Sequence, residues 1–71
     1  MTKEVILMNK IKKFRKEKGL SQLELSYKTE IHPSDISKLE RKKVFAYKNW
    51  RKKLATALEC KEESLFPNID D

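Results

Sequence analysis

The chain has 71 residues, and its 17 lysines and arginines against 11 acidic residues give a net charge of +6. A domain of this size buries only about 60% of its unfolded surface, so we expect a small core. A chain of this length leaves no room for a second domain, a Rossmann-type sheet or a deep substrate cleft. The longest apolar run, Val5–Met8, is too short to span a membrane or to act as a secretory signal. The single cysteine, Cys60, excludes an internal disulfide, so we expect an intracellular, reduced protein.

The positive charge gathers in two stretches. Residues 10–18 and 38–53 are rich in Lys and Arg and contain one acid each, Glu17 and Glu40, whereas the C-terminal end is acidic. Such an excess favours acidic partners, either nucleic acid or anionic lipid. Basic runs are also common on solvated helix faces, so charge alone leaves both interpretations open.

The apolar spacing predicts a helical chain from its beginning. Leu7, Ile11 and Phe14 recur at i, i+4 and i+7, which is one face of a first helix that we expect to end at Gly19. The serine and the glutamate of Ser21–Glu24 have the spacing of a capping box, which predicts the start of a short second helix.

Three further helices are predicted. Pro33 suits the first position of a third helix, where its missing N–H costs nothing, and this helix should run to about Arg41. The residues that outline a fourth helix are Trp50, Leu54, Ala57 and Leu58. Residues 62–66 predict a fifth that stops before Pro67. The expected fold class is therefore all-α, a compact five-helix bundle.

The join between the second and third helices is the most informative feature. Only Glu30–His32 separates them, so two short helices meet at a steep angle, and Ser26 is small enough to let them approach closely. The apolar residues that would fill this angle are Leu25, Ile31, Ile36 and Leu39. This is helix-turn-helix geometry, in which the second of the two helices projects into the major groove of DNA.

Two segments carry a family resemblance, GLSQLELS at 19–26 and IHPSDISKLE at 31–40. They resemble the phage repressor and Cro type (XRE-like) of helix-turn-helix, and LATALEC at 54–60 with LF at 65–66 is similar to the end of that family's domain. The resemblance covers about residues 8–66. It implies a lambda-repressor-like DNA-binding domain of five helices that binds double-stranded DNA, generally as a dimer, and regulates transcription.

The sequence departs from the family pattern at three positions. Glu30 and Lys42 stand where the family usually has Gly, and Ser26 replaces the usual Ala. If Glu30 must be left-handed, its side chain costs about 1 kcal/mol. Arg15 and Glu40 occupy positions that in the family often form a buried-side ion pair between the first and third helices, and we expect that pair to be structural.

The third helix is the expected reading element. Ser34, Asp35 and Lys38 share one helix face, with Ser37 beside them. By family position, the base-facing group is His32, Pro33, Ser34, Asp35, Ser37 and Lys38. Lys38 can donate to guanine O6 or N7, whereas Asp35 can accept from cytosine N4. Asp35 also suits a simple cap of the helix, and the structural role of Pro33 at the first helical position is sufficient to explain that residue.

The resemblance also implies contacts with the sugar-phosphate backbone. Gln22 starts the second helix, which in the family crosses the backbone and hydrogen-bonds a phosphate. Lys42, Lys43 and Lys48 fall in the predicted loop after the third helix, where the family grips the backbone. Such contacts position a protein on DNA without reading its sequence.

The remaining expectations concern boundaries and assembly. We expect residues 1–7 to be an N-terminal extension, 8–66 the DNA-binding domain and 67–71 an acidic tail. The C-terminal end repels DNA yet carries apolar side chains, which favours it as the homodimer contact. The residues expected there are Leu65, Phe66 and Ile69, and the competing surface is Val5–Leu7.

Other functions find little support in the sequence. No carboxylate–histidine pair, catalytic triad or Gly-rich phosphate loop indicates an enzyme, and His32 and Cys60 lack companions for a metal site. We therefore expect no cofactor and no metal, and take Cys60 as a small buried hydrophobe.

The expected function is a repressor or controller protein, bacterial or phage-encoded, in the cytoplasm at the nucleoid. The alternative is a protein-interaction module, antitoxin-like or part of a developmental switch, in which DNA binding is secondary. RNA binding is a weaker option, because the A-form major groove is too narrow for a helix.

Overall fold

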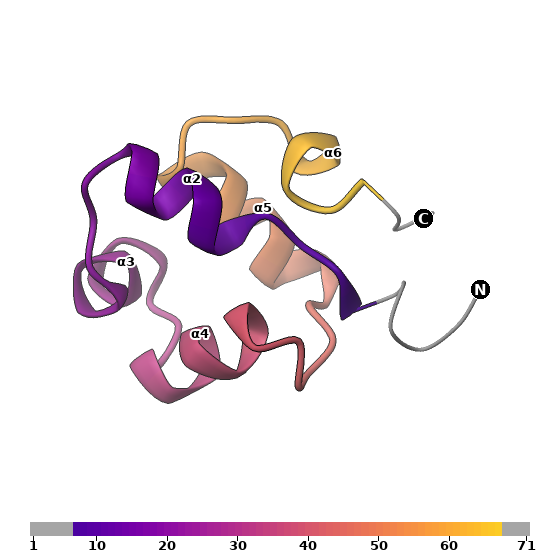
Figure 1. Cartoon of the computed structure of the whole chain (residues 1–71), viewed down its shortest axis with the longest axis horizontal. Coiled ribbons are helices and arrows are strands. Elements are labelled where there is room, and N and C mark those ends of the chain that lie inside the picture. The colour runs from indigo at the N-terminus through magenta and orange to yellow at the C-terminus, as the bar shows by residue number, and fades with distance from the viewer. Residues whose placement is uncertain (1–6, 68–71) are drawn as a thin grey trace.

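The computed structural model describes residues 7–67. Within that range five helices and no strand form a body of 32 × 22 × 20 Å (Figure 1), which confirms the all-α prediction. The helices are α2 (Ile11–Glu17), α3 (Gln22–Thr29), α4 (Pro33–Glu40), α5 (Lys48–Ala57) and α6 (Glu62–Leu65).

Helix α2 is shorter than the apolar spacing predicted. The chain is not helical just before Ile11, so Leu7 lies outside α2, and the expectation of one continuous stripe is wrong. The side chain of Asn9 explains the break, because its Oδ1 accepts the Ile11 N–H at 3.1 Å and its Nδ2 donates to the Leu39 carbonyl at 2.8 Å. The other end is as predicted, since Gly19 is left-handed with a φ of 69°.

Helix α3 begins with the predicted capping box. The Ser21 hydroxyl accepts the Glu24 N–H at 3.0 Å, and the Glu24 carboxylate accepts the Ser21 N–H at 3.0 Å. After α3, Thr29 stabilises the turn, because its buried hydroxyl donates to the Leu25 carbonyl at 2.8 Å and accepts the Ile31 N–H at 3.3 Å. The chain therefore enters α4 at a fixed angle.

Three helices end at left-handed residues other than glycine. Glu30 follows α3 with a φ of 59°, Lys42 follows α4 with a φ of 60°, and Glu59 follows α5 with a φ of 53°. A side chain in this region brings its Cβ close to the following carbonyl oxygen. The replacement of glycine at Glu30 and Lys42 therefore costs stability, as the sequence suggested for Glu30.

The observed bounds of α4 agree with the prediction, whereas the start of α5 does not. Pro33 is the first residue of α4, as predicted, and α4 ends at Glu40. Helix α5 begins at Lys48, so the expectation that Lys48 lies in the loop is wrong. The extended backbone of Tyr47 already accepts the Arg51 N–H at 3.0 Å, which starts the helix two residues before Trp50.

One hydrophobic core joins the helices. Helix α3 packs on α4 and α5, α2 packs on α4, and α6 packs on α5. The buried apolar residues are Ile11, Leu25, Ile31, Ile36, Leu39, Ala46, Leu54, Ala55, Leu58, Leu65 and Phe66. All four residues predicted to fill the angle between α3 and α4 are in this set. Trp50 and Cys60 pack against it from partly buried positions.

The core also contains two of the residues expected at the dimer contact. Leu65 is fully buried and Phe66 is 4% exposed, whereas Ile69 lies outside the described residues. The folded monomer therefore does not offer Leu65 and Phe66 to a second copy. Their apolar character is explained by their burial in the core, where the single turn of α6 packs on α5.

Candidate nucleic-acid interface

Helix α4 lies along one side of the molecule, and the connection that follows it reaches the same side (Figure 1). Ile36 and Leu39 point into the core, so the opposite face of α4 is open. Of the predicted reading residues, His32, Ser34 and Lys38 are exposed, and Pro33, Asp35 and Ser37 are half-buried. Helix α4 thus presents a polar face to solvent, while its apolar face packs in the core.

The cap of α4 is His32, not Asp35. The His32 Nδ1 accepts the Ser34 N–H at 3.1 Å and lies 2.7 Å from the Ser34 hydroxyl. The Asp35 carboxylate makes no hydrogen bond with any residue in the described range; it stands in the first turn, where the helix dipole favours a negative charge. Asp35 is therefore available as an acceptor on this face.

A buried polar network fixes α4 relative to α2 and α3. The Arg15 guanidinium donates to the Glu40 carboxylate twice, from Nε at 2.7 Å and from Nη2 at 3.0 Å, and to the Leu20 carbonyl at 2.8 Å. This confirms the ion pair that the family resemblance implied. The hydrogen bond to Glu40 raises the pKa of Arg15 although burial opposes it. Gln22 joins the network, since its Nε2 donates to Glu40 Oε1 at 3.1 Å.

Arg51, a residue that was not predicted from the sequence, holds the connection between α4 and α5. Its buried guanidinium donates from Nη1 to the Ala46 carbonyl at 2.7 Å, and its Nε lies 3.8 Å from a Glu62 carboxylate oxygen. The spacing offered a hint, because Arg51 precedes Leu54 by three residues and Leu58 by seven, on the apolar face of α5. A buried arginine on such a face needs partners, and here they include a loop carbonyl and the Glu62 carboxylate of α6.

Exposed cations surround the C-terminal end of α4. In the described part of the chain, the ion pairs are Arg15–Glu40, Lys18–Glu59 and Arg51–Glu62. None of them involves the exposed cations in and after α4, which are Lys38, Arg41, Lys42, Lys43 and Lys48. Within residues 7–67, no ion pair therefore compensates the positive charge of this region, which suits a polyanion.

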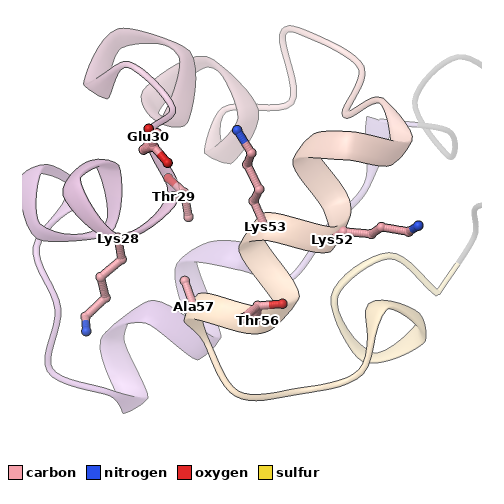
Figure 2. A pocket seen from close by; sticks show the side chains of 7 residues that line it. All are labelled: Lys28, Thr29, Glu30, Lys52, Lys53, Thr56 and Ala57. Carbon is pink, nitrogen blue, oxygen red and sulfur yellow. The ribbon is translucent and has the colours of Figure 1, made fainter.

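A shallow pocket of about 260 Å³ lies between the end of α3 and α5. Its lining residues are Lys28, Thr29, Glu30, Lys52, Lys53, Thr56 and Ala57. Figure 2 shows the ammonium groups of Lys28 and Lys52 pointing in opposite directions, away from one another. Sites for small ligands have polar groups that converge, so this pocket does not favour a small-molecule site.

Chemistry elsewhere in the described residues is limited. No group of three or more His, Cys, Asp or Glu side chains there could hold a metal ion, and none of the helices there is long and apolar enough to cross a membrane. Burial raises the pKa of the Cys60 thiol, which lowers the share of reactive thiolate at neutral pH.

The comparisons with known proteins bear on the face around α4. A family model described as helix-turn-helix matches residues 11–44, from the first residue of α2 into the connection after α4. This Cro/C1-type family consists of DNA-binding regulators that are typically not enzymes. The searches of curated proteins and of solved structures each gave no match.

Proposed function

We propose that this chain, whose residues 11–44 match the helix-turn-helix family model, is a repressor or controller protein of the Cro/C1-type family of DNA-binding transcription regulators. In this proposal it binds a two-fold-symmetric operator as a homodimer. The observation that carries the proposal is the open polar face of α4, which the buried Arg15–Glu40 pair holds in a fixed orientation. In this proposal the protein is bacterial or phage-encoded, acts in the cytoplasm at the nucleoid, and uses residues 8–66 as its DNA-binding domain.

The proposed base contacts come from α4. Lys38 donates to guanine O6 or N7, and Asp35 accepts from cytosine N4, because these are the groups that the two bases present in the major groove. The Ser34 and Ser37 hydroxyls, which can donate or accept, contact neighbouring base edges. Pro33 packs against a thymine methyl group.

The proposed backbone contacts flank the reading face on two sides. Lys42 and Lys43 follow α4 and Lys48 begins α5, so the three residues stand at the two ends of the connection between these helices. Gln22 donates to Glu40 through its amide nitrogen and keeps further hydrogen-bonding capacity for a phosphate. Because each lysine–phosphate contact releases counterions, the affinity should fall steeply as salt rises.

The homodimer would place two α4 helices in successive major grooves, with half-sites centred about 10 base pairs apart. The burial of Leu65 and Phe66 restricts the contact to side chains that the monomer leaves exposed. We propose that the surface around α6 and its flank, including Ile69, remains the contact, with Val5–Leu7 as the competing segment. Sedimentation of the protein with and without operator DNA would measure the assembly directly.

The test of the function is in vitro selection of the purified protein against a random duplex library at near-physiological salt. Enrichment of a two-fold-symmetric site is the expected outcome. Lys38→Ala should then relax the preference at one base position by about 1–3 kcal/mol, whereas Lys43→Ala, the matched control, should weaken binding to all sequences alike. If both variants lose affinity equally on every sequence, α4 is not the reader.

A specific observation favours a second candidate, a protein-interaction module. Leu23 and Tyr27 lie one turn apart on α3 and are 50% and 74% exposed, so together they form an apolar ridge. Exposed apolar side chains that adjoin one another are typical of a protein contact. This function would be favoured over operator binding by two results together. The protein would co-purify with a stoichiometric protein partner whose binding Tyr27→Lys abolishes, and it would enrich no DNA site.

A further inference from the structure

The hydrogen bond that caps α4 restricts the protonation of His32. A backbone N–H is always a donor, and the Ser34 amide directs its hydrogen at the His32 Nδ1 over 3.1 Å. The accepting nitrogen must therefore carry a lone pair and no hydrogen. In a neutral imidazole, the proton then sits on Nε2.

The Ser34 hydroxyl agrees with this assignment. It lies 2.7 Å from the same nitrogen, and a hydroxyl can rotate to donate to a lone pair. If the proton were on Nδ1, it could reach the hydroxyl oxygen but would collide with the hydrogen of the Ser34 amide. A ring turned by 180° would place a carbon against the amide and lose both contacts, so a single tautomer satisfies the site.

The cap leaves the other ring nitrogen free for a partner. His32 is exposed, it immediately precedes α4, and its Nε2 has no hydrogen bond with the described residues. We propose that His32 is a specificity-determining residue of the reading face, fixed by its cap as a hydrogen-bond donor to an acceptor on a base edge. This inference rests on the proposed function, because it requires α4 to lie in the major groove of a duplex.

The chemistry of the groove defines what such a donor selects. Guanine offers N7 and O6, adenine offers N7 and thymine offers O4 as acceptors, whereas cytosine presents only its N4 amino donor. His32 therefore disfavours cytosine at one position of each half-site and favours guanine, which has two acceptors. With Asp35 as an acceptor and Lys38 as a second donor, α4 would present donor, acceptor and donor along its length.

The first experiment concerns the free protein and needs no DNA. Nitrogen-15 NMR of the imidazole at mildly alkaline pH distinguishes a protonated ring nitrogen from an unprotonated one. The expected spectrum shows Nε2 protonated in the wild type and in Ser34→Ala, which loses the hydroxyl but keeps the capping amide. A ring protonated on Nδ1 in the wild type would overturn the inference whatever the protein binds.

The second experiment measures what the donor reads. His32→Thr keeps an oxygen that caps α4 but loses the long donor, so it should fold like the wild type, as a thermal melt would show. In parallel in vitro selections, it should lose the wild type's preference against cytosine at one position, a change of about five- to a hundredfold in relative affinity. Preferences at the other positions should be retained.

The remaining outcomes separate the inference from the proposed function. A wild-type site whose base preferences all persist in His32→Thr overturns the base contact alone. Equal weakening of every sequence by His32→Thr would assign the donor to a phosphate and also overturn it. If the wild type enriches no site, the proposed function fails and the base contact fails with it, although the NMR result would still establish the tautomer.

Discussion

Removing either member of the buried pair between Arg15 and Glu40 should lower the stability of the fold strongly. The Arg15 side chain is 10% exposed and that of Glu40 is 3% exposed, with two hydrogen bonds joining them. Removing one member leaves the other as a charge with too few partners in the interior. We expect Arg15→Met to leave Glu40 with only the amide of Gln22.

The magnitude follows from the burial of the pair. Breaking a buried ion pair by deleting one partner costs about 3–5 kcal/mol, because the remaining charge is desolvated without compensation. A domain of this length has a free energy of unfolding of about 4–10 kcal/mol, so Arg15→Met should retain only a small margin or none. Replacing both members by apolar residues, as in Arg15→Met with Glu40→Leu, should cost far less than either change alone.

Urea denaturation followed by the fluorescence of Trp50, which is partly buried against the core, would measure these differences. The expected result is a large coupling energy between the two sites, because the double variant should lie within about 1–2 kcal/mol of the wild type and thus lose far less than the sum of the two single variants. A loss below about 1 kcal/mol in Arg15→Met would refute the reasoning, because that is the range of an exposed pair. Additive losses in the double variant would refute it as well.

Three further predictions concern a helix end, a cap and the core. Glu30→Gly should raise the free energy of unfolding by about 0.5–1 kcal/mol, since relief of left-handed strain exceeds the entropy of the new glycine; a lower midpoint in urea would contradict this. The Ser21 amide lowers the pKa of the Glu24 carboxyl, so its contribution to stability is present above the ordinary value of 4.5 and is lost as the pH falls through the lowered value. Glu24→Gln should flatten this acid limb in a series of urea titrations, and an unchanged limb would exclude the cap as its source. Leu65→Ala should destabilise the monomer by about 2–5 kcal/mol, and sedimentation showing lost association at unchanged stability would show that the side chain faces a partner.

Features that depend on a few neighbouring residues were predictable. The capping box of α3, the left-handed Gly19 and the position of Pro33 are decided within four residues of chain, and all three agree with the structure. The apolar spacing likewise predicted the residues that pack between α3 and α4. Local hydrogen bonds and helix faces depend on the spacing of residues along the chain, so the sequence alone indicates them.

The all-α class of the chain and the polar face of α4 follow from the spacing of apolar and polar residues along the sequence. The roles of particular side chains at that face depend on contacts between distant parts of the chain. The Asn9 side chain, which interrupts the helix before α2, donates to the Leu39 carbonyl near the C-terminal end of α4. Arg51 donates to the Ala46 carbonyl in the connection before α5. The burial of Leu65 turned an expected dimer contact into core, and the bond from the Ser34 amide made His32 a cap. These outcomes depend on which groups meet in space and on the orientation of single hydrogen bonds, and spacing along the chain encodes neither.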